Sequence, residues 1–224
     1  MSPIPVPSPD PTVQAYLRLS TCNVSDALDR LHLEGAPLGL LPLWPGCRKI
    51  AGRAMTVRLV PEGPISAVHG TLRAITEARA GDIMVVDHDG RMDVNSWGGI
   101  AASTSAQRGL GGVIIDGVTR DVDEMKSLGF SAYGRGIIQR SIRGRCAFGG
   151  HGIEVRLAGV RVRAGDLVIA DDNGVAIVPQ DRLDEVLRAA QASLADEEKI
   201  RDWIAQGVDP VEAHERVHYD RAGG

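Results

Sequence analysis

Two short apolar runs, each preceded by a segment with helical spacing, constrain the fold of this chain more than any other feature. Residues 81–87 (GDIMVVD) and 112–117 (GVIIDG) are typical of buried strands, and helical patterns precede them at 68–79 and 98–109. Such alternation favours a sheet with helices packed outside it. Since 224 residues can bury a sizeable core, we predict an α/β fold with central strands.

The segments on either side fit the same class. Near the start, helices are expected at 11–19 and 21–31, the second with Thr21 or Asn23 as its N-cap. A strand is expected at 54–60, and a short helix over 121–129 that Gly129 closes. The later pattern predicts short strands at 130–136, 153–157, 160–162, 166–172 and 175–179, and then a long amphipathic helix or a broken pair over 181–207.

The chain divides into three parts by composition. Four prolines in residues 1–10 predict an extended arm, because proline removes hydrogen-bond donors and fixes the backbone. Residues 11–205 are expected to form one domain, and residues 206–224 a tail. The segment Asp171-Asp172-Asn173-Gly174 lacks the spacing of an EF-hand loop and predicts a hairpin turn at Asn173-Gly174.

Charge and cysteine content exclude several classes of partner. The net charge of −4 gives no reason to expect nucleic acid or an anionic membrane as a ligand. No apolar run approaches the roughly 20 residues of a membrane span. The proline-rich start is unlike a signal peptide. Cys22, Cys47 and Cys146 are far apart and fit neither a zinc site nor a disulfide framework, so we expect a reducing compartment, the cytoplasm.

A compact charged group, Arg120, Asp121 and Glu124, follows directly after the second apolar run. Ligand sites in α/β sheets tend to lie beyond the carboxyl ends of strands, where this group is placed. If Asp121 starts the next helix, Glu124 lies on the same face. Two carboxylates suit Mg²⁺ or Mn²⁺ better than zinc, and Arg120 could pair with a carboxylate or stabilise a developing enolate.

A structural interpretation of the same group stands beside the catalytic one. An aspartate at a helix start with a glutamate three residues later also stabilises the helix as a cap and through its dipole. The preceding stretch, Gly98-Gly99-Ile100-Ala101, has two interpretations as well. Backbone N–H groups of a glycine-opened helix bind carboxylates or phosphates, but small residues also allow a helix to pack closely on a sheet.

At these residues the chain resembles a known family. Gly99, twenty intervening residues and then Arg120-Asp121-x-x-Glu124 is similar to the signature of RraA-like proteins, which include class II 4-hydroxy-4-methyl-2-oxoglutarate aldolases. The resemblance extends over roughly residues 13 to 205, through NVSDAL, AGDIMVVD and VRVRAGDLVIADDNGVAIVP. It implies a swivelling β/β/α fold with barrel-like strands, assembled as a homotrimer or a dimer of trimers.

The resemblance also implies a reaction. Asp121 would bind Mg²⁺ or Mn²⁺, with Glu124 as a second ligand. Arg120 would contact the pyruvoyl part of a small 2-oxo acid, and the N–H groups of residues 98–101 its carboxylate. The expected activity is cleavage of a 4-hydroxy-2-oxo acid to give pyruvate, with oxaloacetate decarboxylation as a side activity. An acidic residue of a neighbouring protomer, Glu197 or Glu198, would complete the site.

One position departs from the well-studied aldolases, which carry an aspartate where this chain has Gly99. Glu124 or Asp123 is expected to restore the missing charge. A second hypothesis, from another class, is a non-catalytic regulator that binds a ribonuclease or another protein; the intact Arg120-Asp121 pair favours the lyase. A methyltransferase is disfavoured because a glycine-rich nucleotide motif after a first strand is missing.

Other candidate residues are given structural interpretations. We expect His69 and the group Asp87-His88-Asp89 to be structural or to form a polar turn, and Asp26 to cap a helix. Lys126 is expected to be solvated and no Schiff base is needed. Cys146 has no visible activating partner. The segment QRSIRGR, with Arg140, Arg143 and Arg145, could attract a polyanion, but a solvated loop is favoured.

Overall fold

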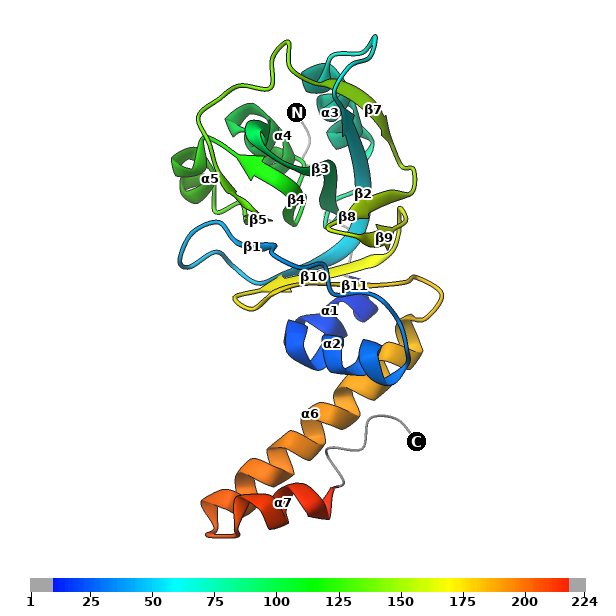
Figure 1. Ribbon diagram of the computed structural model, residues 1–224, viewed down its shortest axis with the longest axis vertical. Coiled ribbons are helices and arrows are strands. Elements are labelled where there is room, and N and C mark those ends of the chain that lie inside the picture. The colour runs from blue at the N-terminus through cyan, green and yellow to red at the C-terminus, as the bar shows by residue number, and fades with distance from the viewer. Residues whose placement is uncertain (1–9, 218–224) are drawn as a thin grey trace, which may run out of the picture.

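A nine-stranded mixed sheet lies at the centre of the computed structural model, which describes residues 10–217 (Figure 1). The strand order is β1-β5-β4-β3-β2-β10-β11, with β6 paired to β4 and β7 to β2, and β8 and β9 form a separate ribbon. The strands are β1 (Leu41–Pro42), β2 (Ile50–Val60), β3 (Ile83–Trp97), β4 (Gly112–Thr119), β5 (Ala132–Gly134), β6 (Gly136–Ile137), β7 (Ala147–His151), β8 (Val155–Leu157), β9 (Val160–Val162), β10 (Leu167–Asp171) and β11 (Gly174–Val178). The helices are α1 (Pro11–Leu17), α2 (Thr21–Arg30), α3 (Ala67–Glu77), α4 (Gly99–Gln107), α5 (Val122–Leu128), α6 (Leu183–Ala205) and α7 (Pro210–Arg216). The α/β prediction is confirmed.

The centre of the sheet is parallel and buried on both faces. Strands β2, β3, β4 and β5 run parallel, and α3, α4 and α5 connect them in turn. In the run Gly112 to Thr119 every residue is buried, which explains why the sequence there is continuously apolar instead of alternating. One core lies between the sheet and these helices, around Val86, Trp97 and Ile115. The two apolar runs are therefore the strands that the sequence predicts.

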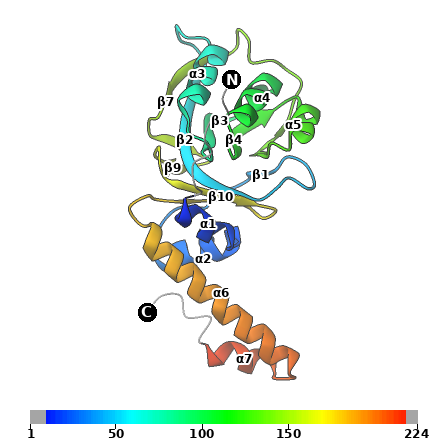
Figure 2. The same ribbon diagram turned by 180° about the vertical axis from the view of Figure 1, so that it is seen from behind.

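A second layer of helices covers the β10–β11 hairpin. Helices α1, α2 and α6 pack on it around Tyr16, Leu28 and Val186 (Figures 1 and 2). The predicted hairpin is confirmed, but Asp171 pairs with Gly174, so its two-residue turn is Asp172-Asn173, one residue earlier than expected. This hairpin also pairs with β2, which joins the helical layer to the parallel centre.

Several boundaries differ from those expected. The N-cap of α2 is Ser20 and not Thr21 or Asn23. The Ser20 hydroxyl accepts the Asn23 N–H at 3.0 Å, and Asn23 Oδ1 accepts the Ser20 N–H at 3.1 Å. Strand β3 continues ten residues past Asp87, because its second half keeps irregular pairing with β4 through three register shifts. Strand β7 and helix α7 were not expected.

The long helix α6 is continuous, so the alternative of a broken pair is wrong. Its far end extends away from the sheet and α7 folds back along it, with Arg216 stacked 5.1 Å over the Trp203 ring (Figures 1 and 2). The predicted tail thus contains a helix. The predicted arm lies outside the described residues except for Asp10, which caps α1 and pairs with Arg53 at 2.8 Å.

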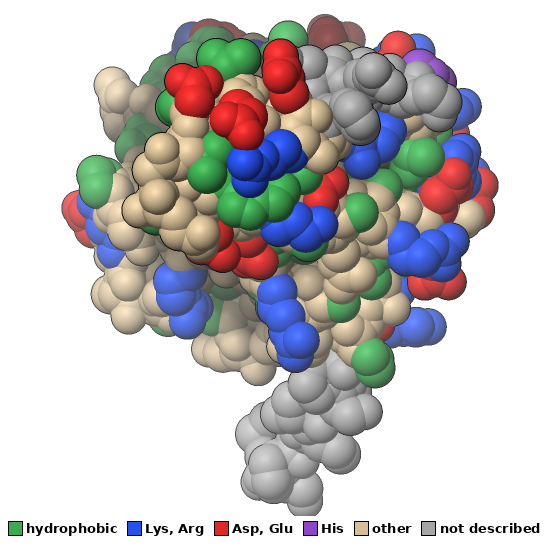
Figure 3. Space-filling view, turned by 90° about the horizontal axis from the view of Figure 1, so that it is seen from below, with side chains coloured by type: hydrophobic (Ala, Val, Ile, Leu, Met, Phe, Trp, Pro, Cys, Tyr) green, Lys and Arg blue, Asp and Glu red, His purple; other side chains and the backbone are tan. Residues whose placement is uncertain are grey.

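One face of the molecule has mixed charge. Seen from below, acidic and basic side chains are interspersed on its coloured part (Figure 3). Within residues 10–217, no helix is both long and apolar enough to cross a membrane.

We expect the contact between Asp171 and helix α2 to make stability depend on pH. Burial alone would raise the Asp171 pKa, but hydrogen bonds from Thr21 and Asn173 bring it below the ordinary value. A carboxyl whose pKa is lower in the folded state stabilises the fold above its unfolded pKa, and this contribution is lost as pH falls through the folded value. Asp171→Asn should cost about 1–3 kcal/mol at pH 7 and less below pH 4.

Urea denaturation at pH 7 and pH 3.5 measures this difference, with the exposed neighbour Asp172→Asn as the control. An Asp171→Asn cost that is equal at both pH values would contradict the assignment.

Candidate active site at the ends of strands β3 and β4

The candidate site begins where two neighbouring parallel strands end. Trp97, the last residue of β3, pairs with Thr119, the last residue of β4. The Thr119 hydroxyl donates to the Trp97 carbonyl oxygen at 2.9 Å, and the Arg120 N–H donates to the same oxygen at 3.1 Å. Because both strands stop at one level, the glycines after β3 lie beside the charged residues after β4. This is the strand-end location that the sequence predicts.

Asp121 connects these two segments. Its Oδ2 accepts the Gly99 N–H, the first N–H of α4, at 3.0 Å, across 22 residues of sequence. Asp121 is the N-cap residue of α5 and acidic residues follow in the first turn, as the structural interpretation expects, but its side chain makes no capping hydrogen bond in this helix. Its backbone is left-handed (φ 58°, ψ 38°), a conformation that costs most residues roughly 1 kcal/mol and that aspartate tolerates. The turn directs the carboxylate toward α4.

Gly98 and Gly99 are required by close approach. A Cβ at Gly98 would lie 2.9 Å from Asp121 Oδ2, and the φ of −158° there is open to any residue. A Cβ at Gly99 would lie 1.8 Å from Glu124 Oε2. The Glu124 carboxylate therefore occupies the space of a side chain at position 99. Asp123 instead faces solvent and pairs with Lys126 at 3.8 Å, so of these two carboxylates it is that of Glu124 that lies beside Gly99.

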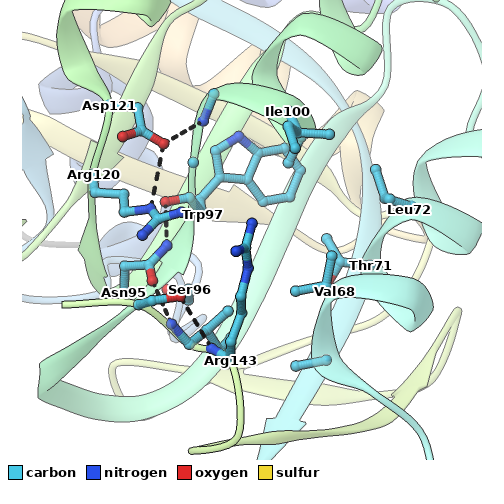
Figure 4. Close-up of a pocket in the computed structure, with 16 residues that line it drawn as sticks. Val68, Thr71, Leu72, Asn95, Ser96, Trp97, Ile100, Arg120, Asp121 and Arg143 are labelled. Carbon is cyan, nitrogen blue, oxygen red and sulfur yellow. Dashed lines mark hydrogen bonds and ion pairs between the residues drawn. The ribbon is translucent and has the colours of Figure 1, made fainter. Parts of the chain in front are cut away.

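Arg120 lies between Asp121 and the pocket. Its Nε is 3.3 Å from Asp121 Oδ2, but the two are not aligned for a hydrogen bond, and this buried Nε has no hydrogen-bond partner in the described chain. The side chain runs from the end of β4 toward Trp97 (Figure 4). A guanidinium anchored on one side by a carboxylate can offer its remaining N–H groups to an anion.

A pocket of about 80 Å³ opens beside these residues. Trp97 is buried in its wall, whereas Ile100 is 64% exposed and forms part of the lip. Ile100 and Ala101 in the first turn of α4 also line this pocket, and N–H groups in the first turn of a helix have no acceptor within the helix. Its lining residues are Ala67, Val68, Thr71, Leu72, Asn95, Ser96, Trp97, Gly98, Gly99, Ile100, Ala101, Arg120, Asp121, Ser141, Ile142 and Arg143.

Sequence reasoning missed one side of this pocket. Helix α3 and the loop between β6 and β7 contribute Val68, Leu72 and Arg143 to the lining. The favoured interpretation of QRSIRGR as a solvated loop fits the exposure of Arg143, but it missed that this exposed side chain also lines the pocket (Figure 4). The basic cluster was the only signal in the sequence, and it could not tell which arginine lines the pocket.

The residues set aside from the sequence lie elsewhere. His69 lies on α3 and does not line the pocket. Asp87 binds Arg58 at 3.1 Å, and within residues 10–217 no three His, Cys, Asp or Glu side chains are grouped to hold a metal. Cys146 does have partners, contrary to expectation: His88 Nε2 and Arg91 Nη1 each lie 3.2 Å from its sulfur. Burial nevertheless raises the pKa of the Cys146 thiol.

Asp26 and Glu197 lie on the contacting helices α2 and α6. Asp26 is the sixth residue of α2, so the expectation that it caps a helix is wrong. Burial and the nearby Glu197 carboxylate raise the pKa of Asp26. The Glu197 carboxylate accepts from Asn23 Nδ2 at 3.4 Å and pairs with Arg201, whereas Glu198 is exposed. Neither glutamate lines the pocket of its own chain.

The fold and the site define an α/β protein with a small pocket at the ends of parallel strands, and comparison with known proteins identifies its family. The profile of the RraA-like family (Aldolase/RraA) matches residues 21–177. This chain belongs to the RraA-like family.

Three similar proteins illustrate the family. Protein DlpA of Legionella pneumophila is 31% identical over 210 residues, 93% of this chain but only 34% of that longer protein. A Halalkalibacterium halodurans protein, provisionally named a 4-hydroxy-4-methyl-2-oxoglutarate aldolase, is 30% identical over 202 residues. The match covers 90% of this chain and 92% of that protein. The crystal structure of Streptomyces coelicolor RraAS2, from the RNase ES inhibitor RraA family, superposes with a TM-score of 0.78. At 24% identity over 89% of this chain and 99% of RraAS2, it supports the fold.

Replacements of Asp121 should separate its structural role from its charge. Asp121→Ala removes the acceptor of the Gly99 N–H and places alanine in a left-handed conformation, so it should lower the free energy of unfolding by about 1–2 kcal/mol. Asp121→Asn keeps an oxygen acceptor and tolerates this backbone, so it should cost less than about 1 kcal/mol. Urea denaturation tests both, with exposed Asp123→Ala as the control; equal costs for the two Asp121 variants would contradict this geometry.

Proposed function

We propose that this protein is a lyase that cleaves the C3–C4 bond of a 4-hydroxy-2-oxo acid to release pyruvate, and that it also decarboxylates oxaloacetate. The observation that carries the proposal is the convergence of Arg120, Asp121 and the first turn of α4 on one small pocket. Family membership and relatives named as 4-hydroxy-4-methyl-2-oxoglutarate aldolases support it. The pair Arg120-Asp121 built into the pocket favours a lyase over a purely protein-binding regulator.

The residues present fit a divalent cation. Asp121 and Glu124 both place carboxylate oxygens against Gly99, and oxygen ligands suit Mg²⁺ or Mn²⁺. Magnesium is usually held by one or two protein carboxylates, with water and substrate completing its coordination, and both side chains are exposed enough for that. We assign Asp121 and Glu124 as the residues that would hold the ion. When bound, it would supply Lewis-acid polarisation of the keto oxygen.

The protein's own groups orient the substrate. The N–H groups of Ile100 and Ala101, at the positive end of α4, bind the carboxylate next to the keto group. Arg120 donates to the keto oxygen, on which negative charge develops as the C3–C4 bond breaks. One preorganised donor of this kind is typically worth roughly 3–4 kcal/mol in the transition state. The apolar wall around Trp97, Val68 and Leu72 limits access of water.

As the C3–C4 bond breaks, the C4 hydroxyl loses its proton and becomes the carbonyl group of the second product, and C3 must gain a proton to complete pyruvate. No histidine or lysine is among the described lining residues, so we assign both proton transfers to water. Lys126 pairs with Asp123 outside the pocket, which is consistent with a route that needs no Schiff base. The same charge distribution arises when oxaloacetate loses its C4 carboxylate, so one arrangement of groups serves both reactions.

Assembly belongs to the same proposal. We infer a homotrimer or a dimer of trimers in the cytoplasm, in which Glu197 or Glu198 of one protomer approaches the site of another. Sedimentation velocity measures the mass of the assembly directly, and a monomer at all concentrations would remove this part of the proposal.

Replacement of Arg120 tests the chemistry. Arg120→Met should reduce kcat/KM for pyruvate release by about 10²–10³-fold, because the donor to the developing oxyanion is lost. A lactate-dehydrogenase-coupled assay with 4-hydroxy-4-methyl-2-oxoglutarate and with oxaloacetate measures it.

EDTA should abolish turnover in the same assay and added Mg²⁺ or Mn²⁺ restore it, after subtraction of enzyme-free decarboxylation. Undiminished activity in EDTA would overturn the cation-dependent scheme, and unaltered kcat/KM in Arg120→Met the role of Arg120.

The space shared by Gly99 and Glu124 gives a test of cation binding that does not use activity. Gly99→Ala should displace the Glu124 carboxylate and weaken Mn²⁺ binding about as much as Glu124→Gln does. The double variant Gly99→Asp/Glu124→Ala vacates this space, returns one carboxylate to the same place and should recover binding. Electron paramagnetic resonance of free Mn²⁺ measures all three. Binding unaffected by Glu124→Gln would exclude this residue as a ligand.

A further inference from the structure

The loop that joins β6 to β7 is fixed to the body on both sides of Arg143. The Ile142 N–H donates to Asn95 Oδ1 at 2.7 Å, and Asn95 N–H donates to the Arg140 carbonyl oxygen at 3.0 Å. Ile142 is buried in the core next to the sheet. On the other side, Arg91 Nη1 of β3 donates to the Arg145 carbonyl oxygen at 3.0 Å. The backbone around Arg143 is therefore fixed relative to the sheet.

The three arginines of this loop have different partners. Arg140 pairs with Asp93 at 3.4 Å, and Arg145 binds carbonyl oxygens of its own loop. The guanidinium of Arg143 has no hydrogen bond or ion pair with any described residue, although the side chain lines the pocket. Figure 4 shows it reaching between Trp97 and Ile100 on one side and Val68 and Thr71 on the other.

The pocket consequently has two cationic positions and one anionic one. Arg120 and Arg143 line it, and Asp121, the one carboxylate among the described lining residues, is engaged by the Gly99 N–H and Arg120. A ligand with one carboxylate at the start of α4 would leave Arg143 without a partner. A guanidinium fork matches a second carboxylate through two parallel hydrogen bonds, and such charge-assisted bonds are stronger than neutral ones.

We propose that Arg143 binds the distal carboxylate of the substrate and makes the site selective for dicarboxylic over monocarboxylic 2-oxo acids. This inference rests on the proposed function for the placement of the 2-oxo acid end at Arg120 and α4. It assigns a specificity role to a residue outside the Arg-Asp-x-x-Glu group.

Two ligands that lack a 4-hydroxyl group, and so cannot undergo the proposed cleavage, separate the contribution of the distal carboxylate from that of the 2-oxo acid end. The compounds 2-oxoglutarate and 2-oxopentanoate have the same five-carbon 2-oxo acid chain and differ in a terminal carboxylate against a methyl group. Isothermal titration calorimetry of the full-length protein with Mg²⁺ should give about tenfold to hundredfold tighter binding of 2-oxoglutarate. Arg143→Met should bring the ratio of the two affinities close to one, mainly through weaker binding of 2-oxoglutarate.

Matched variants control for loss of structure. Arg140→Met, in the same loop but paired with Asp93, should keep the wild-type ratio. Arg143→Lys keeps the charge without the fork and should give an intermediate ratio. The proposal is overturned if the wild type binds the two compounds equally, if it binds neither, or if Arg143→Met weakens both by the same factor.

The outcome is separable from that of the lyase assay. If the wild type shows the Arg143-dependent preference but releases no pyruvate from any substrate, the selectivity stands and the lyase proposal fails. If pyruvate is released and Arg143→Met leaves the ratio unchanged, the lyase proposal stands and the role of Arg143 is wrong.

Discussion

The hydrogen bond from the Gly99 N–H to Asp121 is the contact on which the site depends. It exists because β3 and β4 are parallel neighbours that end in register, so that the residues following each strand meet. Gly98 has no side chain to block the approach of the carboxylate, and the left-handed turn at Asp121 directs it across. Arg120, one residue earlier, is thereby held at the edge of the pocket. The left-handed backbone at Asp121, which costs roughly 1 kcal/mol, thus places Arg120 and the Asp121 carboxylate at the site.

The surrounding fold makes this alignment rigid. Parallel strands buried on both faces fix the level at which β3 and β4 end, and α3 and α4 cover them with the core around Trp97. The β10–β11 hairpin and its helices stabilise the opposite part of the sheet through β2. Groups placed at strand ends on such a support are well suited to a reaction in which charge develops at one atom.

The sequence predicted the parts of the fold that depend on local pattern. Continuous apolar runs identified β3 and β4, and the spacing of Gly99, Arg120, Asp121 and Glu124 located the site. Local rules failed where tertiary contacts decide. Helix-capping preference predicts a side-chain bond from Asp121 to its own helix, α5, but the Asp121 carboxylate accepts the first N–H of α4. The extension of β3 and the position of Arg143 at the pocket depend on pairing and anchoring by distant residues, which no local pattern records.

In the proposed site, one small pocket brings a cation and a 2-oxo acid together beside Arg120. This arrangement can be examined in a crystal structure with Mn²⁺ and oxalate, an unreactive mimic of the 2-oxo acid end. We expect anomalous density at the Asp121 and Glu124 carboxylates, with oxalate between Arg120 and the first turn of α4. Manganese bound elsewhere on the chain, or oxalate outside this pocket, would contradict it.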